Sequence, residues 1–137
     1  MDLRTEKLRG LRILVAEDEM LILMELEDML EDLGCEVVGR ASTVAAACAA
    51  IDTNALDGAL LDINLRRESI LPAAEMLRAQ GVPFVLVTGY AGRLAETSIL
   101  QDAPRLTKPF TQQALSAAMA DAFTAQAQTN KPMKRHA

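Results

Sequence analysis

Short apolar runs recur along the chain and are separated by polar or periodic segments. The clearest runs are residues 11–16, 58–63 and 82–87, and weaker ones occupy residues 35–40 and 105–107. A run that is apolar on both faces is typical of a parallel strand covered by helices on either side. The pattern therefore predicts five strands, with the run at 58–63 in the centre of a sheet.

The segments between these strands predict helices. The first of them places the following residues on one helical face: Ile22, Leu26, Met29, Leu30 and Leu33. Gly34 is expected as its C-cap, and its methionines are expected to fill the core. Further helices are predicted at about 43–51, 72–81 and 111–122. Residues 91–101 hold too few apolar side chains for more than a short or mobile element.

Strands that alternate with helices favour an α/β fold with right-handed crossovers between parallel strands. The commonest small form is the flavodoxin-like sheet of five strands in the order 2-1-3-4-5, with helices on both faces. This order makes strands one and three neighbours. Ligands of such sheets bind at the carboxyl ends of the strands, so the residues that follow each strand are the candidates for chemistry.

Polar side chains follow the strands at this edge: Glu17 and Asp18, Asp62, Thr88, and Lys108. Taken alone, Asp18 or Glu19 would be explained as an N-cap that complements the dipole of the following helix. Polar groups at the ends of several neighbouring strands indicate a site instead, because the predicted strand order brings them together.

The charges of these residues predict their chemistry. Three neighbouring carboxylates repel one another and raise one another's pKa, so the ionised cluster requires a cation. Ligands that are all oxygen atoms point to magnesium, which takes one or two carboxylates together with phosphate oxygens. Asp62 is then the candidate nucleophile for a phosphoryl group. Lys108 would neutralise the phosphoryl oxygens, and the hydroxyl of Thr88 would donate a hydrogen bond to one of them.

Composition narrows the class of protein. The 137 residues are enough for one domain, and a net charge of -5 with 3% aromatic residues argues against nucleic acid as a partner. No apolar run approaches the roughly 20 residues of a membrane span, and the amino end lacks a signal peptide, so a cytoplasmic location is expected. Cys35 and Cys48 lack metal-ligand spacing and are expected to be reduced structural thiols.

The motifs described above resemble the receiver domains of two-component response regulators over residues 11 to about 123. The motif residues are Glu17-Asp18, Asp62, Thr88 and Lys108-Pro109. The resemblance implies that Asp18, Asp62 and the Asn64 carbonyl ligate magnesium and that Glu17 acts through water. It also implies a sensor histidine kinase as phosphoryl donor, a cis bond before Pro109, and a signalling domain that is not itself an enzyme.

Some features depart from the usual receiver pattern. Arg66 stands where a proline is common, and residues 66–69 are expected to form an unusual polar loop. Residues 83–90 resemble the Phe-Ala-Thr-Gly-Tyr subgroup of stand-alone receivers, although Leu86-Val87 replaces Phe-Ala. We expect an N-terminal extension at 1–10, a receiver domain at 11–125 and a disordered tail at 126–137. Without an output domain, the chain is expected to bind an unidentified downstream protein or to drain phosphate from a kinase, as a monomer or weak dimer.

The conformational switch is also expected to differ. Most receivers carry an aromatic residue three positions before the lysine, whereas this chain has Arg105. An unpaired guanidinium would cost several kcal/mol to bury, so it cannot replace the ring. Tyr90, two residues after Thr88, is the alternative. Our hypothesis is that phosphorylation orders the Tyr90 loop together with residues 91–101.

Two other classes of protein fit the sequence less well. A magnesium phosphohydrolase of the haloacid dehalogenase type needs a second aspartate two residues after its nucleophile, where this chain has Asn64. A degenerate receiver would bind partners without being phosphorylated. The joint presence of an acidic pair, Asp62, Thr88 and Lys108 argues against that alternative.

Overall fold

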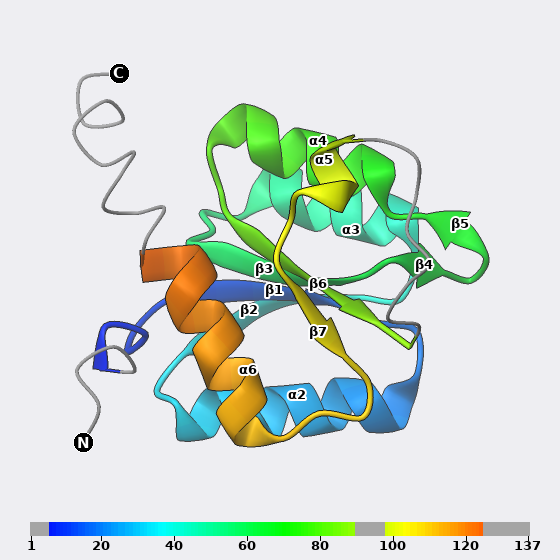
Figure 1. Cartoon of the computed structure of the whole chain (residues 1–137). Helices are drawn as coiled ribbons and strands as arrows, with labels where there is room; N and C mark the ends of the chain where they lie inside the picture. The colour runs from blue at the N-terminus through cyan, green and yellow to red at the C-terminus, as the bar shows by residue number, and fades with distance from the viewer. Residues whose placement is uncertain (1–5, 90–97, 125–137) are drawn as a thin grey trace, which may run out of the picture.

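Five parallel strands form the central sheet. A computed structural model describes residues 6–89 and 98–124, and the structural statements below concern these residues. The strands are β1 (Arg12–Ala16), β2 (Glu36–Ala41), β3 (Gly58–Asp62), β6 (Phe84–Thr88) and β7 (Arg105–Thr107). They lie in the order β2-β1-β3-β6-β7, which confirms the predicted flavodoxin-like order 2-1-3-4-5 (Figure 1).

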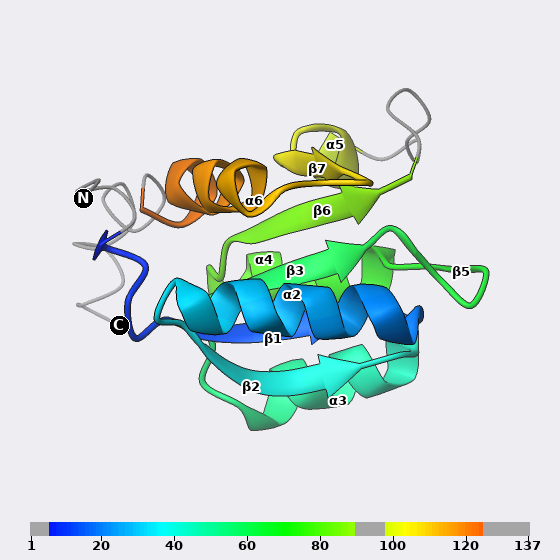
Figure 2. The ribbon, with the colours of Figure 1, turned by 90° about the horizontal axis from the view of Figure 1, so that it is seen from below.

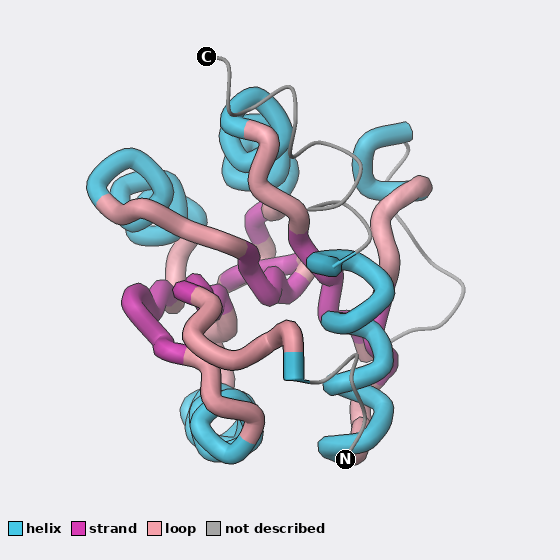
Figure 3. Tube along the Cα trace, turned by 90° about the vertical axis from the view of Figure 1, so that its left-hand side faces the viewer, coloured by secondary structure: helices cyan, strands magenta, loops and turns pink. Residues whose placement is uncertain are grey.

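Helices cover both faces of this sheet (Figures 1 and 3). One face carries α3 (Val44–Thr53), α4 (Leu71–Gln80) and α5 (Ser98–Gln101). The other face carries α2 (Met20–Asp32) and α6 (Gln112–Met119), which continues into the π-helical segment η1 (Ala120–Thr124). The arrangement has three layers, with the sheet in the middle.

Alternation along the buried strands divides the core into two layers. Ala59 and Leu61 of β3 join Leu86 in the layer beneath α3 and α4, whereas Leu60 joins Val85 in the layer beneath α2 and α6. Successive side chains of a strand point to opposite faces, so a strand must be apolar throughout to supply both layers. This requirement explains the continuous apolar runs in the sequence.

Local capping sets the ends of several helices. Thr43 Oγ1 accepts a hydrogen bond from the Ala46 N–H at 3.0 Å, and Thr111 Oγ1 accepts one from the Ala114 N–H at 3.0 Å. Gly81 is the C-cap of α4, and its φ of 73° suits a residue without a side chain. Thr43 is therefore the N-cap of α3.

The start of α2 corrects one expectation. Met20, Leu21 and Met24 are 66%, 77% and 51% exposed, so the methionines at this end of the helix do not fill the core. Leu26 and Leu30 are fully buried and define the side of α2 that faces the sheet. At 100° per residue, the three exposed side chains fall on the opposite side of the helix.

The predicted N-terminal extension contributes to the core. Leu8 is fully buried and packs in the layer beneath α2 and α6, and the Cys35 thiol donates a hydrogen bond to the Leu8 carbonyl at 3.2 Å. Cys35 and Cys48 are both free thiols. Burial raises the pKa of Cys35 to about 11, which suits a structural role.

A hairpin replaces the polar loop expected after β3. It consists of β4 (Asn64–Leu65) and β5 (Glu68–Ser69), which pair in antiparallel fashion. The hairpin extends beyond the sheet on the side where the central strands end (Figure 2). Arg66 and Arg67 form its turn with φ values of 50° and 70°.

Candidate functional site

The register of the sheet aligns the polar residues that follow its strands. Ala16 pairs with Leu61, so Glu17 comes next to Asp62. Asp62 in turn pairs with Val87, and Thr88 follows. Thr88 pairs with Thr107, and Lys108 follows. The predicted residues therefore gather at one edge, as the strand order requires.

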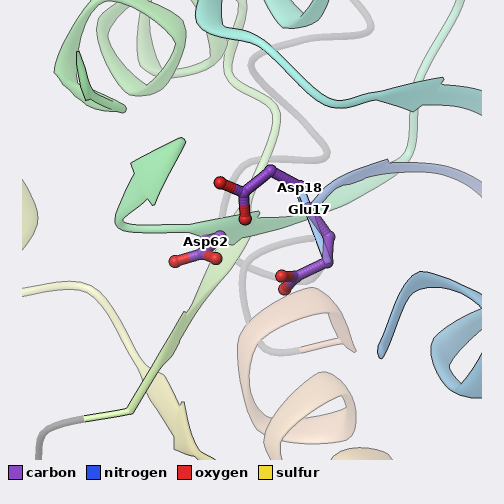
Figure 4. Close-up of side chains that lie close together, drawn as sticks. All are labelled: Glu17, Asp18 and Asp62. Carbon is purple, nitrogen blue, oxygen red and sulfur yellow. The ribbon is translucent and has the colours of Figure 1, made fainter. Parts of the chain in front are cut away.

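Glu17, Asp18 and Asp62 form an acidic cluster in which one oxygen from each carboxylate lies within 4.8 Å of the others. Figure 4 shows the three carboxyl groups close together, with Glu17 and Asp18 coming from the chain after β1 and Asp62 from β3. Glu17 is 1% exposed and Asp62 9% exposed, whereas Asp18 is half-buried. The cluster is thus largely shielded from solvent at the carboxyl-terminal edge of the sheet.

Lys108 supplies a positive charge to this cluster. Its Nζ donates hydrogen bonds to Glu17 Oε2 at 3.2 Å and to Asp62 Oδ2 at 3.3 Å. Burial alone would lower the pKa of Lys108, but the Asp62 and Glu17 carboxylates outweigh it and raise the pKa. The Lys108–Pro109 peptide bond is cis, and the Lys108 N–H donates to the Thr88 carbonyl at 2.8 Å.

The surroundings of Glu17 disfavour its ionised form. Burial and the neighbouring Asp62 carboxylate raise the pKa of Glu17 from 4.5 to about 7, although the Glu19 N–H and Lys108 oppose the shift. Glu17 Oε2 accepts from Lys108 and from the Glu19 N–H, whereas Oε1 is buried without a hydrogen-bond partner in the described part of the chain. A buried carboxylate oxygen without a donor is costly, and a cation would satisfy it.

The alternative explanation of the acids as helix caps is wrong. Glu19 occupies the N-cap position of α2 but makes no side-chain capping hydrogen bond. Asp18 Oδ2 accepts instead from the Arg66 N–H at 2.9 Å. Asp18 is thus held by a contact from a distant segment, and Glu19 stands at the N-cap position without a capping bond from its side chain.

The donor set fits magnesium. The candidate ligands are oxygen atoms only, Lys108 pairs with two of the three carboxylates, and Glu17 Oε1 has no hydrogen-bond partner among the described residues. The Asn64 N–H donates to Asp62 Oδ1 at 3.3 Å, which places the backbone of Asn64 beside the cluster. Its carbonyl remains a predicted ligand.

Of the candidate switch residues, Thr88 and Arg105 lie in the described part of the chain. Thr88 is 5% exposed at the end of β6. Arg105 does not enter the core: it is half-buried, and its Nη2 donates to the Gln101 carbonyl at 3.0 Å. Tyr90 and most of the segment 91–101 lie outside the described residues.

The hairpin is the part of the site that sequence reasoning missed. Arg66 contacts Asp18 through its backbone and the Ser42 carbonyl through Nε at 3.2 Å. The departure from proline at position 66 was the available signal. It indicated an unusual loop, but two arginines do not carry the Asn-Gly signature of a tight hairpin turn.

Comparison with known families identifies the class of this domain. The family described as "Response regulator receiver domain" matches residues 13–120. The chain belongs to this family.

No helix in the described segments has the length and apolar character needed to cross a membrane.

Individual relatives are regulators with receiver domains. The chain is 32% identical over 114 residues to the phyllosphere-induced regulator PhyR of Methylorubrum extorquens, covering 81% of this chain and 43% of PhyR. The curated relatives that it matches are longer, and the chain spans about two fifths of their length.

Similarity to solved structures agrees with the assignment to the receiver-domain family. SdrG from Sphingomonas melonis Fr1 is 44% identical, with a TM-score of 0.73, over 81% of this chain and 94% of that chain. The receiver domain of the sensor histidine kinase PA1611 from Pseudomonas aeruginosa is 25% identical, with a TM-score of 0.73, over 84% and 98% of the two chains. The PA1611 structure is described with a magnesium ion coordinated in its active-site cleft.

Proposed function

We propose that this receiver domain accepts a phosphoryl group on Asp62 from a sensor histidine kinase in a magnesium-dependent reaction. The observation that carries the proposal is the position of Asp62, whose Oδ2 lies 3.3 Å from Lys108 Nζ and which neighbours Glu17, whose Oε1 has no partner within the described segments. This arrangement combines a nucleophile, a fixed cation and a place for a second cation at one edge of the sheet.

The transfer conserves atoms and charge as follows. A carboxylate oxygen of Asp62 forms a new bond to phosphorus, and the phosphorus–nitrogen bond of a phosphohistidine breaks. The electron pair of the broken bond goes to the imidazole nitrogen, which takes up a proton. The product is an aspartyl phosphate, and the kinase histidine is regenerated.

The residues around Asp62 have separate tasks in this reaction. Asp18, Asp62 and the Asn64 carbonyl would hold magnesium directly, and Glu17 would hold it through water. When bound, the metal supplies positive charge for the phosphoryl oxygens. Lys108 neutralises a further oxygen, and the hydroxyl of Thr88 donates to the bound phosphoryl group.

The phosphorylated domain is proposed to act by binding a downstream protein or by draining phosphate from its kinase. Similarity to the anti-anti-sigma factor PhyR from Bartonella quintana supports a protein partner. The Tyr90 loop remains our candidate for the segment that responds to phosphorylation. Relaxation measurements by NMR with and without beryllofluoride test this, since unchanged dynamics of residues 91–101 would contradict it.

Intact mass spectrometry tests the acceptor. Incubation with acetyl phosphate and magnesium should add the mass of one phosphoryl group to the wild-type chain. Asp62→Asn should remain unmodified, because an amide cannot replace the carboxylate nucleophile. Equal modification of the variant at the same rate would show that another residue is the acceptor.

A further inference from the structure

The turn between β4 and β5 has an unfavourable backbone for its residues. Arg66 and Arg67, with φ values of 50° and 70°, are the non-glycine residues with positive φ in the described part of the chain. Positive φ at both central positions is the requirement of a two-residue type I′ loop, which selects Asn-Gly. Residues with a Cβ are strained in this conformation, so contacts elsewhere must hold the turn.

The base of the hairpin provides the first set of contacts. Leu65 and Ile70 are fully buried in the layer beneath α3 and α4, and the Ile70 N–H donates to the Ile63 carbonyl at 2.9 Å. At the tip, Arg66 Nε donates to the Ser42 carbonyl at 3.2 Å. The hairpin is therefore fixed to the core at its base and to the loop between β2 and α3 at its tip.

The hairpin presents backbone donors to the acidic cluster. The Arg66 N–H donates to Asp18 Oδ2 at 2.9 Å, and the Asn64 N–H donates to Asp62 Oδ1 at 3.3 Å. A hydrogen bond to a carboxylate is stronger than one between neutral groups. The bond from Arg66 fixes one oxygen of Asp18 and leaves the other for a cation.

We propose that the β4–β5 hairpin positions Asp18 for magnesium through the N–H of Arg66, and that the left-handed turn at Arg66 and Arg67 aims this N–H. Arg66 is then a positioning residue that acts on Asp18 through its backbone N–H, whereas its guanidinium, bonded to the Ser42 carbonyl, only helps to hold the tip of a hairpin that is anchored at its base. The inference rests on the proposed magnesium site and adds an element that sets the affinity of that site.

Substitutions that separate the backbone from the side chain test this inference. Arg66→Pro removes the N–H and cannot adopt positive φ, whereas Arg66→Ala and Arg66→Gly keep the N–H and remove the long side chain with its bond to Ser42. We expect Arg66→Pro to bind magnesium about tenfold more weakly or worse, which is the loss typical of one hydrogen bond to a charged group. Arg66→Ala and Arg66→Gly should stay within about twofold of wild type.

Calorimetric titration with magnesium chloride measures the affinities, and the thermal unfolding midpoint of each variant reports on folding. Unchanged or tighter binding by Arg66→Pro would overturn the proposal. So would an equal loss in Arg66→Ala, because that result would assign the effect to the guanidinium.

Hydrogen exchange provides a second measurement that needs no metal. In Asp18→Ala, the amide of Arg66 should exchange with solvent about tenfold faster than in wild type, because its acceptor is gone. The amide of Ile70, which donates within the base of the hairpin, should be unaffected. An unchanged rate at Arg66, or an equal acceleration at Ile70, would overturn the inference.

The two experiments separate this inference from the proposed function. If wild type binds magnesium and is phosphorylated but Arg66→Pro behaves identically, only the role of the hairpin is wrong. If wild type binds no magnesium, the proposed function fails, and the exchange rates still decide whether Arg66 holds Asp18.

Discussion

Lys108 and Glu17 meet across the sheet, with Nζ and Oε2 3.2 Å apart, although β3 and β6 separate the strands that precede them. The same ammonium group lies 3.3 Å from Asp62 Oδ2. One lysine thus forms ion pairs with two buried carboxylates at the ends of two different strands. Its removal would leave both without their opposite charge.

Lys108→Met should therefore destabilise the chain in the absence of magnesium. We expect the free energy of unfolding to fall by about 1–3 kcal/mol at pH 8, since two carboxylates lose a partly buried partner. The loss should be smaller at pH 5, where Glu17 holds a proton. Urea unfolding in the presence of EDTA measures both values. Lys7→Met, which removes an exposed lysine, is the matched control. An equal loss of stability in Lys108→Met at both pH values would contradict the explanation.

The raised pKa of Glu17 predicts how stability depends on pH. Between its ordinary pKa of 4.5 and the folded value of about 7, the folded state binds more protons than the unfolded state. Stability must then fall as pH rises through this window, by about 2–3 kcal/mol for this group without magnesium. Urea unfolding at pH 5 and pH 8 should show the fall in wild type and a much smaller one in Glu17→Gln. An equal or steeper fall in the variant would refute the assignment.

Gly58 is expected to tolerate no side chain. A Cβ at this position would lie 2.8 Å from Cζ of Phe123, whose ring is buried at the end of η1. Gly58→Ala should lower the free energy of unfolding by about 1–3 kcal/mol through overpacking. In a double-mutant cycle measured by urea unfolding, Phe123→Leu should recover part of this loss. Strict additivity of the two substitutions would argue against the steric explanation.

The two sides of α2 should respond differently to substitution. Leu21 is exposed, so Leu21→Ser should change the free energy of unfolding by less than about 0.5 kcal/mol. Leu30 is fully buried, and Leu30→Ala should cost about 2–5 kcal/mol. Thermal or urea unfolding distinguishes these values easily. A large loss in Leu21→Ser would mean that this side of the helix is covered in solution.

The strands and their order were predictable because their physical signal is local. A central parallel strand must be apolar on both faces, and residues 58–61 and 84–87 satisfy this before each strand ends in a buried polar residue. Once the order is known, the ends of neighbouring strands coincide. The positions of Asp62, Thr88 and Lys108 at one edge follow from that geometry.

The remaining features depend on contacts between distant segments. Met20 is apolar, so its residue type alone does not reveal that it is exposed. It faces outward because α2 packs on the sheet with the other side of the helix. The hairpin at residues 64–69 is stabilised by Asp18 and Ser42, and nothing near Arg66 in the sequence reveals either contact. The local sequence even disfavours the turn, so tertiary interactions determine it.

The packing of Leu8 has a consequence for thiol chemistry. Its carbonyl accepts from the Cys35 thiol, and its side chain fills the layer in which Cys35 lies. A chain shortened to begin at residue 11 would lose both contacts and admit water to the thiol, whose pKa would then fall toward that of an ordinary cysteine. The first turn of the described chain therefore protects Cys35 from alkylating reagents and oxidants, and the rate of its alkylation reports on whether that turn is docked.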